Sequence, residues 1–140
     1  MKNKLGVHAL VWEAGWSHDG CARAIAKSAE VGFDFIEASM PEPDEIDVDY
    51  TRRELEKNNL GINISFGLSP HTDITSPDKE IVARGRKHLE QEVRLARDLG
   101  ASYICGILHS SFGKENEPNT PEGAKRSAEV LAHIAELAAA

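Results

Sequence analysis

The sequence lacks an excess of basic residues. Its 16 Lys and Arg residues are outnumbered by 23 Asp and Glu residues, and the formal net charge over 140 residues is −7. Proteins that bind nucleic acid usually carry a surplus of Lys and Arg that neutralises phosphates. We therefore expect no nucleic-acid partner.

Long apolar runs and cysteines are also scarce. No apolar stretch approaches the length of a membrane span. The apolar N-terminal stretch is short, is broken by His8 and has no small-residue cleavage site after it, so we expect no signal peptide. The two cysteines, Cys21 and Cys105, lie among apolar neighbours, which predicts buried thiols in a reducing compartment. These features predict a cytoplasmic protein without a membrane partner.

Apolar strand-like segments alternate with helix-like segments along the chain. Gly32, Gly61 and Gly100 each stand directly before an apolar segment, as expected where a helix ends and the chain turns into a strand. Ser76-Pro77-Asp78 and Thr120-Pro121-Glu122 are typical helix starts. The pattern predicts strands over 4–10, 33–39, 62–68 and 101–108, helices over 20–31, about 50–58, 76–99 and 120–140, and solvated loops over 41–49 and 109–119.

Four successive βα units fit two architectures. One is an open, doubly wound sheet, and the other is half of a (β/α)₈ barrel. The segment after the first strand contains only Gly15 and Gly20, so it has no Gly-x-Gly-x-x-Gly phosphate loop, which argues against a dinucleotide site. In both architectures ligands bind at the carboxyl ends of the strands.

Polar and aromatic residues gather at those predicted strand ends. His8 is the only polar side chain in GVHALV, and it is either a hydrogen-bonded core histidine or part of a pocket. Glu37 ends the second strand and either binds a ligand or makes a structural ion pair. His71 and His109 follow the third and fourth strands, but two histidines make a weak signal for zinc, which takes three or four ligands. Trp12 is expected to pack against the core, whereas Trp16 either packs in the same way or faces a ligand. His18, His88 and His133 are expected to be solvated.

Five segments together resemble the ketose 3-epimerases. They are GVHALVWEAGW (6–16), VGFDFIEAS (31–39), ISFGLS (64–69), SPDKEIVARG (76–85) and CGILHS (105–110). These D-tagatose/D-psicose (allulose) 3-epimerases are xylose isomerase-like TIM barrels. The resemblance implies an α/β fold in which residues 1–140 are the N-terminal half of a single (β/α)₈ barrel, truncated before strand five.

The resemblance also implies an isomerase of carbohydrate metabolism that inverts C3 of free ketoses through an enediolate. A divalent metal, Mn²⁺, Mg²⁺ or Co²⁺, and two glutamates would carry the chemistry. The first of these glutamates belongs to a fifth strand, so we assign no catalytic or metal-binding residue within 1–140. We expect this chain alone to be inactive and the complete protein to be a homodimer or homotetramer.

The resemblance assigns substrate-binding wall positions to the first half of the barrel. His8 stands where the family places an aromatic residue, and Trp16 matches a tryptophan that covers the sugar. Five further residues are assigned to the sugar site by the resemblance or by their place at a strand end. They are Glu37, Ser65, Gly67, Ile107 and His109. Two other readings stay open. One is a non-catalytic half-barrel that serves as an assembly module, and the other is an enzyme like hydroxypyruvate isomerase or inosose dehydratase.

Overall fold

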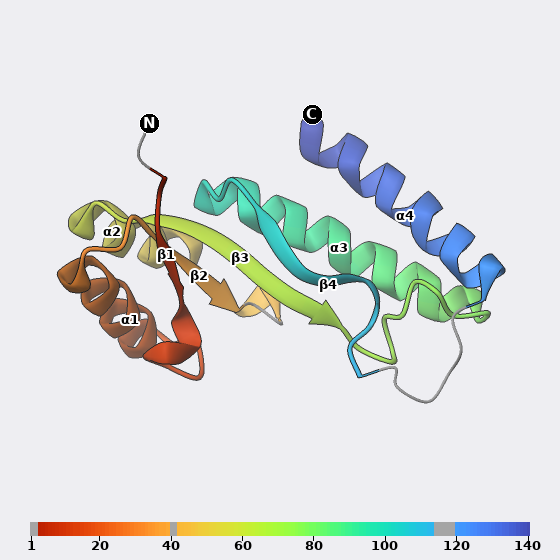
Figure 1. Cartoon of the computed structure of the whole chain (residues 1–140), viewed down its shortest axis with the longest axis horizontal. Coiled ribbons are helices and arrows are strands. Elements are labelled where there is room, and N and C mark those ends of the chain that lie inside the picture. Colours follow the sequence, from red (N-terminus) through yellow and green to blue (C-terminus); the bar gives the residue numbers. More distant parts are fainter. Residues whose placement is uncertain (1–2, 40–41, 114–119) are drawn as a thin grey trace. The chain divides into compact units, whose positions relative to one another are not determined.

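The computed structural model describes residues 3–39, 42–113 and 120–140. Within them, strands and helices alternate along the chain (Figure 1). The loop predicted over 109–119 lies in part outside the described residues. The elements are β1 (Gly6–His8), η1 (Ala9–Val11), α1 (His18–Val31), β2 (Phe35–Ser39), η2 (Pro43–Glu45), α2 (Val48–Asn58), β3 (Gly61–Leu68), α3 (Lys79–Leu99), β4 (Ile104–Ser111) and α4 (Pro121–Ala139).

The four strands form one sheet in the order β1-β2-β3-β4. β1 pairs in parallel with β2, where Val7 is opposite Ile36. β2 pairs in parallel with β3, where Ile36 is opposite Ile62. Sequential parallel strands joined by helices are the arrangement of a (β/α)₈ barrel, and this confirms the predicted βα units. No helix in the described part of the chain is long and apolar enough to cross a membrane.

The chain divides into two compact units. The first, here called the N-terminal unit, comprises Met1–Ser65 and Leu95–Cys105. The second, the C-terminal unit, comprises Phe66–Arg94 and Gly106–Ala140.

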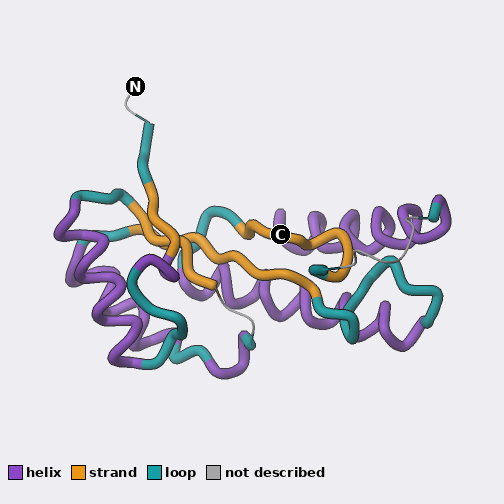
Figure 2. The backbone as a smooth tube through the Cα atoms, turned by 60° about the horizontal axis from the view of Figure 1, so that its bottom comes forward, coloured by secondary structure: helices purple, strands orange, loops and turns teal. Residues whose placement is uncertain are grey.

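The N-terminal unit has its core between the strands and the helices α1 and α2, which lie together on one side of β1 and β2 (Figure 2). Alternate residues of β2 and β3 are buried in this core, and α1, α2 and the last residues of α3, Leu95, Ala96 and Leu99, supply other side chains. The core includes Ala24, Ile25, Ile36, Ala38, Leu55, Ile62 and Ile64. The intervening residues of β2 are only half-buried, so the two faces of these strands differ.

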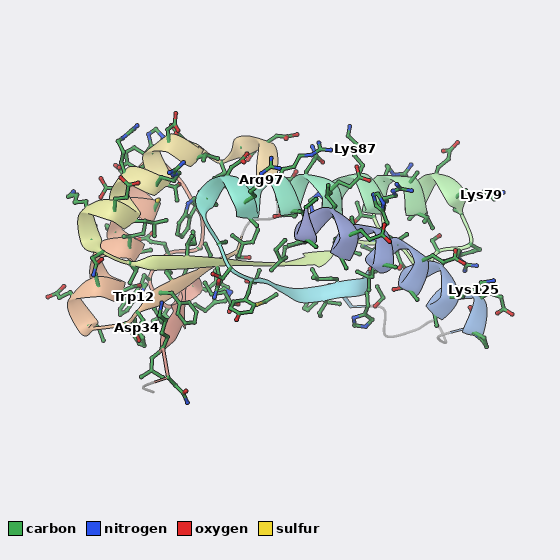
Figure 3. All side chains as sticks on the ribbon, turned by 90° about the horizontal axis from the view of Figure 1, so that it is seen from above. Trp12, Asp34, Lys79, Lys87, Arg97 and Lys125 are labelled. Carbon is green, nitrogen blue, oxygen red and sulfur yellow. The ribbon has the colours of Figure 1, made fainter. Side chains whose placement is uncertain are left out.

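In the C-terminal unit, α4 runs beside α3. Arg86 and Glu90 of α3 both contact His133 of α4, each with a 3.0 Å separation from its Nε2. Lys79 and Lys87 project outward from α3 (Figure 3). His88, which was expected to be solvated, has an 18% exposed side chain 3.6 Å from the buried carboxylate of Glu92. That prediction was wrong because His88 lies on the face of α3 that packs against the ring of Phe66.

The helix starts follow the capping rules, with small shifts. Thr120 accepts a hydrogen bond from the amide of Gly123 at 3.0 Å and caps α4, as predicted. α3 begins at Lys79, two residues later than Pro77. There the Asp78 carboxylate caps the helix by accepting a hydrogen bond from the amide of Glu80 at 2.8 Å. Asp78 takes the capping position that Ser76 was expected to hold, since aspartate caps a helix as well as serine does.

Other boundaries also differ from the predicted ones. The fourth strand spans Ile104–Ser111 instead of 101–108, so it includes the first residues of the predicted loop 109–119. The first strand ends at His8, not at residue 10, because the His8 ring accepts a hydrogen bond from the Leu10 amide and starts the 3₁₀ turn η1. The acidic segment 41–49 is not a simple solvated loop. Its described part contains η2, and its Asp47 caps α2 by accepting from the Tyr50 amide at 2.9 Å.

Candidate functional site

Three polar side chains from neighbouring strands meet in the N-terminal unit, two of them half-buried and the third, that of Ser65, buried. His8, Glu37 and Ser65 come from β1, β2 and β3, and we call them the polar cluster. His8 and Glu37 are direct partners in the parallel register. The Nε2 atom of His8 lies 3.3 Å from the Ser65 hydroxyl and 3.8 Å from a Glu37 carboxylate oxygen. Sequence reasoning named all three residues, and the structure brings them together.

The orientation of the His8 ring is fixed by the main chain. Its Nδ1 accepts a hydrogen bond from the Leu10 amide at 3.1 Å. A neutral ring that accepts at Nδ1 carries its proton on Nε2. The N–H of His8 therefore points at the hydroxyl of Ser65 and the carboxylate of Glu37.

The polar cluster is suited to binding hydroxyl groups. The His8 and Glu37 side chains are 35% and 31% exposed, so both can reach a ligand while they are held in place. Together they offer an N–H donor, a carboxylate acceptor and a hydroxyl that can do either. A Ser-His-acid triad needs the acid on the ring nitrogen opposite the serine, but here both groups face Nε2. The arrangement favours polyol binding over nucleophilic hydrolysis.

The two tryptophans have different partners in the N-terminal unit. The indole N–H of Trp12 donates to the Ser28 hydroxyl at 2.9 Å, and the ring packs against the core, as predicted. The indole N–H of Trp16 donates to the Thr51 hydroxyl at 3.1 Å. The half-buried ring of Trp16 packs against the core, and its N–H is taken up by Thr51. Thr51 was not foreseen, because no sequence signal pairs residues 35 positions apart.

The other three predicted wall residues lie in the C-terminal unit. His109 is exposed at its side chain, while its main-chain carbonyl accepts from the Ser127 hydroxyl at 2.7 Å. Ile107 is half-buried in β4. Gly67 in β3 has the side chain of Phe112 where a Cβ would stand, 3.3 Å away. Gly67 therefore leaves room for Phe112, whose side chain is 68% exposed.

The two cysteines are both free, but they differ in burial. Cys21 is buried as predicted, and its desolvation raises the pKa of the thiol to about 11. Cys105 is only half-buried, so that part of the prediction was too strong. Burial, followed by the negative charge of Glu37, raises the pKa of Cys105.

These thiols are expected to react with a disulfide reagent at different rates in the folded chain. Because the thiolate is the reactive form, a pKa of about 11 leaves roughly one Cys21 thiol in a thousand ionised at pH 8. Titration with dithionitrobenzoate at pH 8 should release one equivalent slowly from Cys105 and the second only after denaturant is added. In a Cys105→Ala variant the native-state release should disappear. Rapid release of two equivalents from the folded chain would contradict this expectation.

The described residues of the chain do not fit a metal centre. Within 3–39, 42–113 and 120–140, no three His, Cys, Asp or Glu side chains are grouped so that they could hold a metal ion. His71 and His109, the two weak zinc candidates, both have exposed side chains. The divalent metal that the resemblance implies therefore finds no group of three such ligands among the described residues.

Comparisons with known proteins find similar sequences and a similar fold among the 3-epimerases. L-ribulose 3-epimerase of Methylomonas sp. (strain DH-1) is 39% identical over 134 residues, which cover 96% of this chain and 47% of that protein. Ketose 3-epimerase of Arthrobacter globiformis is 33% identical, with 96% and 47% covered. The crystal structure of D-allulose 3-epimerase from Methylomonas sp. in complex with D-allulose matches with a TM-score of 0.94 at 37% identity, and the match covers 99% of this chain and 49% of that one.

The fold is the N-terminal half of a TIM barrel. The family model described as xylose isomerase-like TIM barrel matches residues 25–140, and the chain belongs to this family. The chain spans about half the length of the curated relatives that it matches.

Proposed function

We propose that the complete barrel to which this chain contributes its first half is a ketose 3-epimerase acting on free sugars. The observation that carries this proposal is the likeness of 99% of the chain to the D-allulose-bound D-allulose 3-epimerase, at a TM-score of 0.94. Relatives named L-ribulose 3-epimerase and ketose 3-epimerase support the same activity. The polar cluster adds a local reason, because a ketose presents several hydroxyls and one carbonyl to its binding site.

In this proposal the chain binds and orients the sugar and does not perform the proton transfer. The Nε2–H of His8 donates to a sugar oxygen, and the carboxylate of Glu37 accepts from a sugar hydroxyl. Ser65, 3.3 Å from His8, holds the ring in register and can bond the same hydroxyl. The indole face of Trp16 covers the apolar C–H face of the sugar. Gly67, Ile107 and His109, in the C-terminal unit, remain substrate-binding predictions from the resemblance.

The remaining parts of the proposal concern the complete protein. A divalent metal, with Mn²⁺ as first choice, would stabilise the enediolate, and residues outside those described would hold it. The two catalytic glutamates would likewise come from the other half of the barrel. We further propose a cytoplasmic homodimer or homotetramer.

The test is an epimerase assay on the complete barrel with a panel of ketoses. D-fructose and L-ribulose are incubated with Mn²⁺, Mg²⁺ or Co²⁺ in D₂O, and the products are followed by NMR. The expected result is the C3 epimer of each sugar with deuterium at C3, since an enediolate exchanges that proton. The 140-residue chain alone is the control and should be inactive. Failure to convert any ketose, or isomerisation of hydroxypyruvate or dehydration of an inosose instead, would overturn the proposal.

A further inference from the structure

We infer that Thr51 is a positioning residue that fixes the Trp16 ring for its contact with the sugar, a role that rests on the proposed function. Thr51 lies in the first part of α2, and its side chain is 1% exposed. Its hydroxyl accepts the indole N–H of Trp16 at 3.1 Å and faces the Cys21 thiol at 3.8 Å. A buried threonine from one βα unit therefore holds the loop of another.

The loop that carries Trp16 is attached on both sides. It runs between η1 and α1, and α1 holds it through the Arg23–Glu13 ion pair at 2.6 Å. The bond from Trp16 to Thr51 attaches it to α2. The start of α2 is itself well fixed, because Asp47 caps it and also lies 2.9 Å from Nε2 of His18. The Thr51 hydroxyl thus sits on a rigid support.

The α1–α2 contact beside it adds to this rigidity. The His18 ring stacks on the Tyr50 ring with centroids 4.0 Å apart. The Tyr50 amide and His18, by their hydrogen bonds, lower the pKa of the Asp47 carboxyl. The carboxylate is therefore charged near neutral pH, which keeps the cap and the His18 contact in place. Trp16 is consequently held by a preformed anchor, and an aromatic side chain fixed in advance loses little freedom when it meets a ligand.

The anchor also limits how the tryptophan can bind. Its only N–H is used by Thr51, so the ring can offer a ligand only its π face and edge. Such a contact is made equally in the ground state and the transition state of a remote reaction. Loss of the anchor should therefore raise KM and leave kcat nearly unchanged.

The experiment compares Thr51→Val with Thr51→Ser. Valine keeps the shape but has no hydroxyl, whereas serine restores the acceptor. In the complete barrel, Thr51→Val should raise KM for the ketose by about three- to tenfold, the range that loss of one neutral hydrogen bond supports, with kcat within twofold. Thr51→Ser should restore most of the KM. Cys21→Ala, which removes the other partner of Thr51, is the matched control and should leave KM unchanged.

A spectroscopic readout separates this inference from the proposed function. In the 140-residue chain, a Trp12→Phe background leaves Trp16 as the remaining tryptophan, and there Thr51→Val should shift its emission to the red and weaken its near-UV circular dichroism. Those changes are expected even if the protein proves not to be an epimerase. Unchanged spectra in Thr51→Val would overturn the inference whatever the activity. Should Thr51→Val not fold, Trp16→Phe, which removes the N–H but keeps a ring, is expected to give the same rise in KM, and an unchanged KM would overturn the inference.

Discussion

Replacing Gly106 by alanine should destabilise the fold by about 3 kcal/mol or more, the largest effect we expect from a single methyl group in this chain. Gly106 lies in β4 with φ +112°, a conformation that L side chains rarely adopt. A Cβ there would also overlap the main-chain carbonyl oxygen of Phe66. Backbone strain of about 1–3 kcal/mol and overpacking of about 1–3 kcal/mol both apply at this position. Urea unfolding followed by circular dichroism measures the loss.

Gly32→Ala is the matched control for this prediction. Gly32 ends α1 with φ +96°, but nothing lies within 4 Å of a Cβ built there. Only the strain of a left-handed residue remains, and it costs about 1–2 kcal/mol. Equal losses for the two variants would show that the close approach of β4 to Phe66 does not matter.

Replacing His8 by phenylalanine in the complete barrel should change which ketose is preferred. The variant removes the Nε2–H that lies 3.3 Å from Ser65 and 3.8 Å from Glu37, and with it one oriented donor. Sites that hydrogen-bond a substrate hydroxyl discriminate strongly against sugars that cannot use the bond. We expect kcat/KM for the wild-type ketose to fall by about tenfold to a hundredfold, the loss for other ketoses to be smaller, and metal affinity to stay within twofold.

His133→Phe is the control for the His8 substitution. It replaces a histidine of similar side-chain exposure, 38% against 35%, but His133 contacts Arg86 and Glu90 in the C-terminal unit, outside the polar cluster. Its ketose preference should remain that of the wild type. Equal losses for every ketose together with weaker metal binding in His8→Phe would refute the proposed role of His8.

The alternation of strands and helices could be predicted from the sequence because residues close together in the chain determine where each element begins and ends. Gly32 and Gly100 take positive φ where helices end, and Thr120 caps α4 through its own side chain. The contact between His8 and Glu37 follows once β1 and β2 pair in parallel, since these residues share a register position. Strand pairing therefore explains why residues that the sequence analysis named one by one come together in the polar cluster.

The features that were not foreseen depend on contacts between distant residues. β1 stops early because the His8 ring turns back to the Leu10 amide, which a strand propensity cannot show. The burial of His88 depends on the Phe66 ring. The bond from Trp16 to Thr51 crosses from the first loop to α2. In each case the deciding partner comes from the tertiary fold or from a side-chain orientation.

The alternation of faces along β2 has a consequence for how such a protein can evolve or be redesigned. Ile36 and Ala38 are fully buried and stabilise the strand by packing in the core, whereas Glu37 between them is half-buried. Changes at Glu37 or His8 are therefore expected to leave the packing beneath them intact. A combinatorial library restricted to the polar cluster should retain a high fraction of folded members, so that variants with a changed ligand preference can be selected without first adding stability.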